Sequence, residues 1–251
     1  MSTGPITSPD NPIVKHFVKL RTSKTYREEN QSVVVVGKRM IDELTPLIPI
    51  KKLIIGQFAR LIHGSLQAKM TRVSQKLLKK MTGVISPDGY IAEFALPTYS
   101  PLTSLGAILI LDQIQDPGNV GTLLRSALAF GFDGVYFIEG TSDPFNDKAL
   151  RAAKGATFHI PLGKGSWCDF FEKVQSHSPY VLYRADLDGL DLKKVKIEKP
   201  FALIVGNEGN GISPIAKAAS TPLTIPMSTK SESLNVAVAG SICMFVMKGY
   251  S

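Results

Sequence analysis

Short apolar segments alternate with amphipathic ones in the first part of the chain. Residues 31–36 and 52–55 are rich in Val and Ile and predict strands. Apolar positions at helical spacing predict helices over 12–20, 38–44 and 74–81. This alternation indicates a small α/β domain.

A second and stronger series of apolar segments follows. Near-continuous apolar strands separated by helices indicate a mostly parallel sheet covered on both faces. In such folds a ligand binds at the C-terminal edge of the strands, so the loops that follow the strands are the candidates for chemistry. The predicted strands are 107–111, 134–138, 180–183, 202–205 and 223–226.

The two series are separated by a segment that fits neither pattern. Two prolines and several small polar residues within 95–104 interrupt both helix and strand periodicity. We therefore predict a first domain over 1–97, a linker over 98–104 and a second domain over 105–251.

Charge distinguishes the two predicted domains. Residues 1–97 hold 15 Lys and Arg against 7 Asp and Glu, whereas 98–251 hold 14 of each, so the whole excess of +8 lies in the first domain. Lys and Arg gain affinity for a polyanion by releasing its condensed counterions, which favours RNA binding by the first domain. A basic surface that only aids solubility explains the scattered lysines equally well.

Several classes of protein are disfavoured by composition. The most apolar stretch, 236–247, is shorter than the roughly 18–20 residues of a membrane span. The N-terminus has no targeting pattern, so we expect a cytoplasmic protein. The two cysteines, Cys168 and Cys243, and the four histidines have no metal-ligand spacing. We expect no metal and two buried, reduced thiols.

The first candidate loop, 112–121, follows a predicted strand and leads into a predicted helix over 120–130. Asp116 and Asn119 can cap that helix, and the two glycines of the loop permit close approach of a ligand. Arg125 then places a cation near the mouth of the site. A capped turn with a surface arginine explains this loop equally well.

Two further loops have the composition of ligand sites. Residues 205–213 contain three glycines around Glu208, and glycine backbone groups can contact a flat ligand directly. A plain turn with Ser213 as N-cap would need fewer glycines. The third segment, 224–240, places Ser233 and Asn235 at the start of an apolar helix, where each side chain can cap the helix or face a substrate.

Taken together, the three segments resemble the three motifs of the SpoU (TrmH-like) branch of the SPOUT RNA methyltransferases. They occur in the family's order and at its approximate separations. Residues 6–15 and 33–39 are similar to the substrate-binding domain of the ribosomal-RNA members. The matching motif positions are Asn119 with Gly121 and Arg125, then 206–213, then 225–227 with 233–236.

The resemblance implies a fold, a cofactor and a reaction. It implies a SPOUT domain with a parallel sheet and a deep trefoil knot made by the second and third loops, preceded by an α/β RNA-binding domain. S-adenosylmethionine (AdoMet) would lie bent in the knot, held by backbone groups of Gly206, Ile225 and Leu234. Such proteins act as homodimers with cofactor sites close to the interface. The reaction is attack of a ribose 2′-hydroxyl on the methyl group of AdoMet.

The resemblance also implies roles for five side chains. Arg125 acts in activation of the hydroxyl, while Asn119, Glu208, Ser233 and Asn235 orient Arg125 or the RNA. A guanidinium has a pKa above about 12 and stays charged. We therefore expect Arg125 to bind the phosphate beside the target ribose and to stabilise the developing alkoxide.

Three alternatives remain for comparison. A Rossmann-type dinucleotide site is disfavoured because the first loop, which precedes Glu139 by about 20 residues, lacks the G-x-G-x-x-G pattern. A non-catalytic RNA-binding or ribosome-binding protein would not need the five polar residues. Transfer RNA is an alternative substrate, although the resemblance of the first domain favours ribosomal RNA.

Overall fold

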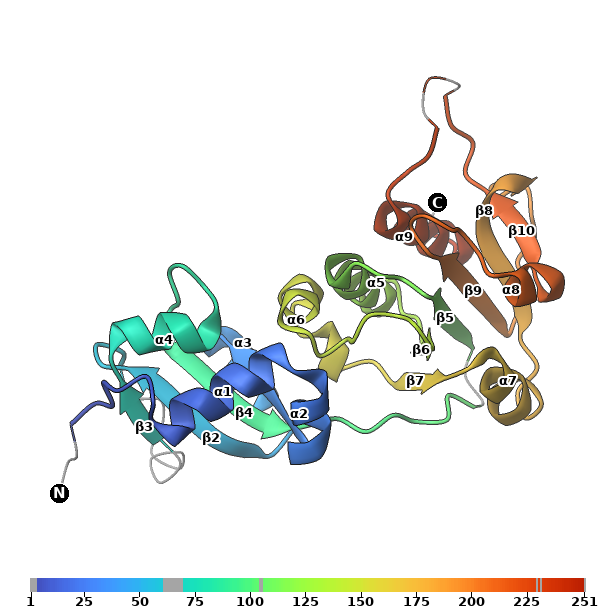
Figure 1. The fold of residues 1–251 in the computed structure, drawn as a ribbon. Coiled ribbons are helices and arrows are strands. Elements are labelled where there is room, and N and C mark those ends of the chain that lie inside the picture. The colour runs from blue at the N-terminus through green and yellow to red at the C-terminus, as the bar shows by residue number, and fades with distance from the viewer. Residues whose placement is uncertain (1–3, 61–69, 104–105, 229, 231, 251) are drawn as a thin grey trace. The chain divides into compact units, whose positions relative to one another are not determined.

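The computed structural model describes residues 4–60, 70–103, 106–228, 230 and 232–250. It divides into two units, one formed by Met1–Pro97 with Phe145–Asp147 and the other by Thr98–Pro144 with Lys148–Ser251. Each unit has its own sheet and its own apolar core (Figure 1). Residues 104 and 105, where the predicted linker meets the second domain, lie outside the described residues.

The first unit contains a four-stranded sheet in the order β1-β4-β2-β3. Strand β4 is antiparallel to both of its neighbours, and β2 is parallel to β3. The elements are α1 (Pro12–Thr22), α2 (Lys24–Asn30), β1 (Ser32–Val36), α3 (Lys38–Leu44), β2 (Ile50–Gly56), β3 (Met70–Val73), α4 (Gln75–Thr82) and β4 (Tyr90–Ala95).

Helices cover both faces of this sheet. Phe17 of α1 and Leu78 of α4 pack against Val34 and Ile54 in one apolar cluster. On the other face, α3 contacts β1 and β4 and buries Ile41. The Val-rich β1 is an edge strand, yet it is buried over most of its length because α1, α2 and α3 pack against it.

The second unit contains a six-stranded sheet in the order β10-β8-β9-β5-β6-β7. Every neighbouring pair is parallel, which confirms the predicted parallel sheet. The elements are β5 (Ala107–Asp112), α5 (Pro117–Ala129), β6 (Gly134–Ile138), α6 (Asp147–Ala153), β7 (Leu162–Gly165), α7 (Trp167–Phe170), β8 (Val181–Asp191), β9 (Phe201–Gly206), α8 (Pro214–Ala219), β10 (Thr221–Thr224) and α9 (Val236–Met247).

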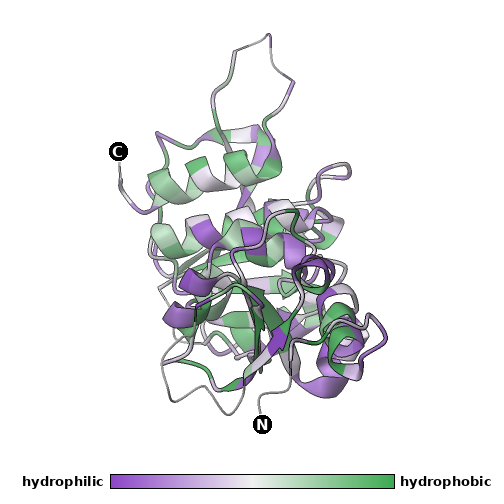
Figure 2. Cartoon of the chain, turned by 90° about the vertical axis from the view of Figure 1, so that its left-hand side faces the viewer, coloured by the Kyte–Doolittle hydropathy of each residue, from purple (hydrophilic) through white to green (hydrophobic). Residues whose placement is uncertain are grey.

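The two faces of the larger sheet bury alternate residues of its strands. Ile108 and Ile204 belong to a cluster with Trp167 of α7. On the opposite face, a Cβ added to Gly240 of α9 would lie 3.3 Å from Val205 and still closer to α5, so the glycine permits close packing. Helix α9, which ends near the C mark in Figure 2, is hydrophobic along most of its length.

The structure contains elements that were not predicted, and it contradicts the predicted burial of Cys168. Helix α2 and strands β3, β4 and β7 were not predicted, and β8 continues well beyond its predicted end. Cys168 is exposed, although Cys243 is buried as expected. Cys168 lies between Trp167 and Phe170 on a short helix whose aromatic side chains face the core, so the thiol is left on the outer side.

The chain path after β9 brings the second predicted loop, 205–213, close to the third predicted segment, 224–240. Strand β10 lies at the outer edge of the sheet beside β8, and α9 then returns to contact β9 and α5. A knotted path through these loops stays a prediction of the family resemblance. In the described parts of the chain, no helix is long and apolar enough to cross a membrane.

Candidate active site

The candidate site begins where the direction of strand addition reverses. Strands β5 and β9 are central neighbours, and the chain adds β6 and β7 on one side but β8 and β10 on the other. The loops after β5 and β9 therefore meet at a topological switch point, the usual ligand position in open α/β sheets. Asn207 Nδ2 donates to the carbonyl of Gln113 at 2.8 Å, which ties the two loops together.

Asp112, at the end of β5, makes a second link between these loops. Its carboxylate is buried, with 1% of the residue exposed, and accepts from Trp167 Nε1 at 3.1 Å and Ser213 N at 2.8 Å. Ser213 occupies the N-cap position of α8, but its side chain makes no cap hydrogen bond. The second loop is therefore anchored by Asp112, a residue that the sequence analysis did not single out.

Glu208 is the main polar anchor of the site. Its Oε2 accepts from Gln115 N at 2.9 Å, and its Oε1 accepts from Asp116 N at 3.1 Å and Asn119 Nδ2 at 2.9 Å. Burial opposes ionisation, but these hydrogen bonds outweigh it and hold the pKa of Glu208 below its ordinary value. Glu208 is therefore an ionised acceptor for three donors of the first loop.

Glu208 fixes the orientation of two asparagines. Because the ionised carboxylate only accepts, Asn119 must present its amide nitrogen to Glu208 and its Oδ1 in another direction. That oxygen accepts from Asn235 Nδ2 at 3.2 Å. The Oδ1 of Asn235 then accepts from the first amides of α9, Ala237 N at 2.9 Å and Val238 N at 3.3 Å. The three predicted residues form one hydrogen-bonded chain across the motifs.

The start of α5 is held in the same network. Asp116 is the N-cap of this helix and accepts from Gly118 N at 2.6 Å and Asn119 N at 3.1 Å. Lys148 Nζ lies 2.6 Å from the other carboxylate oxygen. Hydrogen bonding to Lys148 is the main reason that the pKa of Asp116 is lowered. This capping fixes Asn119 on the first turn of α5.

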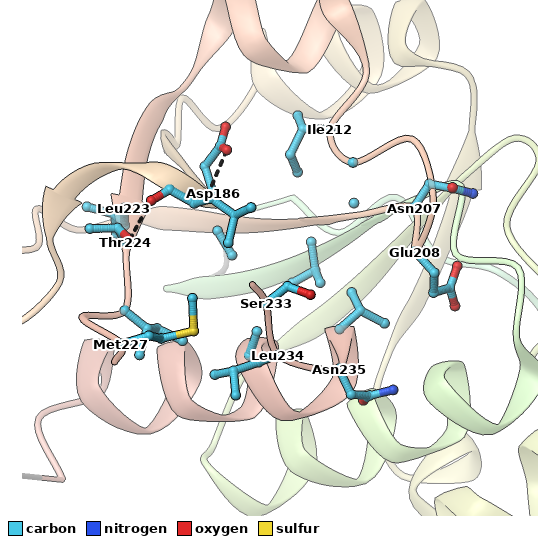
Figure 3. Close-up of a pocket in the computed structure, with 18 residues that line it drawn as sticks. Asp186, Asn207, Glu208, Ile212, Leu223, Thr224, Met227, Ser233, Leu234 and Asn235 are labelled. Atoms are coloured by element: carbon cyan, nitrogen blue, oxygen red, sulfur yellow. Dashed lines mark hydrogen bonds between the residues drawn. The ribbon is translucent and has the colours of Figure 1, made fainter. Parts of the chain in front are cut away.

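A cavity of about 420 Å³ lies beside this network. Figure 3 shows Glu208 and Asn235 at one end, Thr224 and Met227 at the other, and Ser233 directed toward the space between them. The three predicted cofactor-binding residues, Gly206, Ile225 and Leu234, all line the cavity. Apolar side chains complete its walls: Val205, Ile212, Leu223 and Ala239. Its mixture of backbone, apolar and a few polar groups suits a small organic ligand.

Gly206 is needed for the shape of the loop that bounds this cavity. A Cβ at this position would lie 2.6 Å from the backbone C and O atoms of Gly211. Gly211 itself has a φ of +67°, a conformation that favours glycine. Asn207 and Gly211 exchange two backbone hydrogen bonds of 2.9 Å, which close the turn between them.

Among the described residues, no hydrogen bond links Arg125 to the other predicted site residues. Arg125 is an exposed side chain on α5, and it is not among the cavity-lining residues. Asn119 also lies outside the lining, but it is hydrogen-bonded to two residues that belong to it. Within the described parts of the chain, no group of three or more His, Cys, Asp or Glu residues could hold a metal ion.

The three loops that form the candidate site lie within the region that matches a known protein family. A family model described as the SpoU rRNA Methylase family matches residues 106–245, which include all three loops. The chain belongs to this family and is therefore an RNA methyltransferase of the SpoU type.

Similar proteins cover almost the whole chain. The protein named 23S rRNA (guanosine(2553)-2′-O)-methyltransferase RlmP from Bacillus subtilis is 31% identical over 97% of this chain and 99% of its own. The AdoMet-bound rRNA methyltransferase of Sinorhizobium meliloti has a TM-score of 0.84 at 28% identity, covering 98% of this chain and 97% of its own. The SpoU methyltransferase AviRb of Streptomyces viridochromogenes, at 21% identity and a TM-score of 0.84, shares the fold over 95% of this chain and 96% of its own.

Proposed function

We propose that the chain transfers a methyl group from AdoMet to a ribose 2′-hydroxyl of ribosomal RNA. The observation that carries this proposal is the hydrogen-bonded chain of Glu208, Asn119 and Asn235 at one end of a ligand-sized cavity. The Bacillus relative, named for 2′-O-methylation of 23S ribosomal RNA, supports both the position of methylation and the substrate class.

The cavity suits AdoMet in size and chemistry. Pockets of about 300–1,000 Å³ with apolar walls and a few polar groups are typical of cofactor sites, and this cavity falls within that range. Gly206, Ile225 and Leu234 line it and would hold the cofactor through backbone groups. Bound AdoMet would supply an activated methyl group for transfer to the ribose oxygen, with S-adenosylhomocysteine as the leaving group and the hydroxyl proton released to solvent.

The residues of the site would align the ribose rather than remove its proton. Both oxygens of Glu208 already accept hydrogen bonds, and its lowered pKa makes it a weak base. Its role is to fix Asn119 and, through it, Asn235. Ser233 and Asn235 line the cavity and would position the hydroxyl for in-line transfer, where alignment contributes much of the rate.

We propose that Arg125 binds the phosphate next to the target ribose and stabilises the alkoxide charge that develops on its oxygen. Its exposed position on α5 suits contact with RNA rather than with the cofactor. A guanidinium can donate two hydrogen bonds to one phosphate and is always charged at neutral pH, so it fits this role better than that of a base.

The basic first unit is proposed to hold the RNA, and two chains are proposed to form a homodimer. The dimer proposal is supported by exposed apolar side chains on α5 and α9: Leu128, Val238 and Phe245, with Tyr250 just beyond α9. Exposed apolar side chains that gather on one face are typical of protein interfaces. The knotted path of the second unit and a cytoplasmic location remain predictions.

Methyl transfer from radiolabelled AdoMet tests the proposed function. The purified chain is incubated with unmethylated large-subunit, small-subunit and transfer RNA in separate reactions, with R125A as the inactive control. We expect label in large-subunit ribosomal RNA, in a linkage that resists alkaline hydrolysis because the 2′-oxygen is blocked. Label in transfer RNA alone would correct the substrate class, and absence of AdoMet binding would contradict the proposal as a whole.

A further inference from the structure

Three described segments of the first unit, 37–39, 57–60 and 83–89, meet at one end of its strands. They follow β1, follow β2 and precede β4, and these strand ends lie side by side because β4 is antiparallel to both neighbours. Backbone hydrogen bonds join Gly37 N to Tyr90 O at 3.0 Å and Gly56 N to Gly89 O at 2.8 Å. The Tyr90 hydroxyl donates to the carbonyl of Arg60 at 2.7 Å. Hydrogen bonds therefore join these three described segments to one another.

Two apolar side chains project from these loops into solvent. Phe58 is 81% exposed and Ile85 is 87% exposed. The backbone on both sides of Phe58 is fixed, because Arg72 Nη1 donates to the carbonyls of Gln57 at 3.1 Å and Ala59 at 3.3 Å. Because the backbone beside Phe58 is already ordered, its exposed ring can meet a partner with little further loss of conformational entropy.

The same end of the strands presents two uncommitted guanidinium groups. Arg39 and Arg60 are exposed, and their side chains make no ion pair or hydrogen bond with any residue that the structure describes. The nearby carboxylate of Asp88 already accepts from Lys38 N at 2.6 Å and Tyr90 N at 3.3 Å. Lys38 is itself paired with Asp42.

We infer that this loop surface, defined by Arg39, Phe58, Arg60 and Ile85, binds an unpaired segment of the substrate RNA. A base stacks on Phe58, and Arg39 and Arg60 bind the flanking phosphates. Unpaired nucleotides can offer a base face to an aromatic side chain, whereas bases in a duplex are already stacked. The inference rests on the proposed function, which requires an RNA substrate, and adds which surface binds it and which RNA structure it selects.

The other basic surface of the unit lacks these features. Lysines 15 and 19 of α1 and lysines 76, 79 and 80 of α4 are exposed, and Lys15 is paired with Asp10 at 2.9 Å. Ammonium groups act as point charges and attract phosphates of any RNA without distinguishing paired from unpaired bases. This lysine surface provides a charge-matched control for the loop surface.

Binding of two labelled RNA probes to the full-length protein tests the inference. One probe is a hairpin with a purine-rich loop, and the other is a fully paired duplex of the same length. Loss of one base stack should make F58A bind the hairpin about fivefold or more weakly and leave duplex binding unchanged. F58W should keep the affinity and show quenching of the added indole fluorescence by the hairpin. Unchanged melting temperatures would exclude loss of folding.

The arginines are tested through salt dependence. Loss of two phosphate contacts to a single strand lowers the slope of log affinity against log salt by about 1.4, the result expected for R39Q/R60Q with the hairpin. K76Q/K79Q removes the same charge from the lysine surface and should leave the hairpin preference intact. Equal loss in both double variants, or F58A indistinguishable from wild type, would overturn the inference. Wild-type protein that methylates no RNA would instead contradict the proposed function, while the binding results still decide the loop surface.

Discussion

Asn119, in the first motif, is hydrogen-bonded to one residue of each of the other two motifs. Its amide donates to Glu208 and its carbonyl accepts from Asn235, so any replacement that alters donor or acceptor affects both neighbours. We predict that N119D is nearly inactive at neutral pH and recovers as the pH falls. The added carboxylate faces the carboxylate of Glu208, and repulsion between like charges raises the pKa values of the pair. Protonation at lower pH then restores a donor between them.

The measurement is the rate of methyl transfer against pH for wild type, N119D and N119A. N119A has no group that a proton could restore, so its low rate should follow the wild-type profile. In the wild type, no carboxylate at position 119 faces Glu208, whose pKa is lowered. Glu208 therefore stays ionised, and the wild-type rate should not rise as the pH falls. Parallel profiles for N119D and N119A would contradict the interpretation.

Replacement of Arg125 by lysine distinguishes bidentate phosphate binding from a simple effect of positive charge. If the guanidinium holds one phosphate through two hydrogen bonds, R125K keeps the charge but loses the bidentate contact. We expect methyl transfer to fall about tenfold or more, which corresponds to at least about 1.4 kcal/mol in the transition state. AdoMet affinity, measured by calorimetry, should be unchanged because Arg125 does not line the cavity. Near-full turnover of R125K would exclude the bidentate role.

At the residue scale, the sequence motifs correctly indicated residues that line the cavity. Six predicted positions line one cavity, but Asp112, which anchors the second loop, was not predicted. Asp112 bonds Trp167 and Ser213, both distant in sequence, so its importance depends on contacts that no local pattern reports. A carboxylate that ends an otherwise apolar strand is the one signal that could have marked it. The six are Gly206, Glu208, Ile225, Ser233, Leu234 and Asn235.

At the scale of elements, the loop after β9 offers a test with a matched control. G206A introduces a Cβ within 2.6 Å of the Gly211 backbone, whereas the nearest atom to a Cβ at Gly209 is Asn207 Oδ1 at 3.6 Å, an ordinary contact. Overpacking of this kind costs about 1–3 kcal/mol. We expect G206A to weaken AdoMet binding about tenfold or more and G209A to leave it close to wild type, as measured by calorimetry. Equal affinities would show that the turn does not shape the cavity.

The elements that were predicted and those that were missed differ in a physical respect. Strands buried on both faces, such as β5 and β9, are continuously apolar and were recognised. Strand β7 has only four residues, two of them glycine, and forms because it pairs with β6. Helix α2 has little apolar periodicity and is held by its Ser23 cap and its C-terminal turn. Short elements of this kind depend on neighbours and caps rather than on a hydrophobic pattern.

At the scale of the whole molecule, the exposed apolar side chains of α5 and α9 form a candidate interface. Phe130, Phe245 and Tyr250 contact one another at the ends of these helices, with Phe245 and Tyr250 stacked and Phe130 edge-on to Phe245. Val238 lies on α9 one turn from Asn235, so this face runs close to the candidate site. A partner that covers the face would also shield the start of α9, which would couple dimer formation to the geometry of the site.

This coupling leads to a prediction for charged substitutions on α9. V238E places a carboxylate on α9 at a position where the native residue is 48% exposed. The control, I215E, places one on α8, where the native residue is 52% exposed. We expect wild type and I215E to sediment as dimers and V238E as a monomer, because burial of an unpaired charge in an interface is unfavourable. Methyl transfer should be lost with V238E and kept with I215E, at equal melting temperatures of the two variants. A fully active V238E monomer would show that the site is complete in one chain, and a V238E dimer would place the interface on another surface.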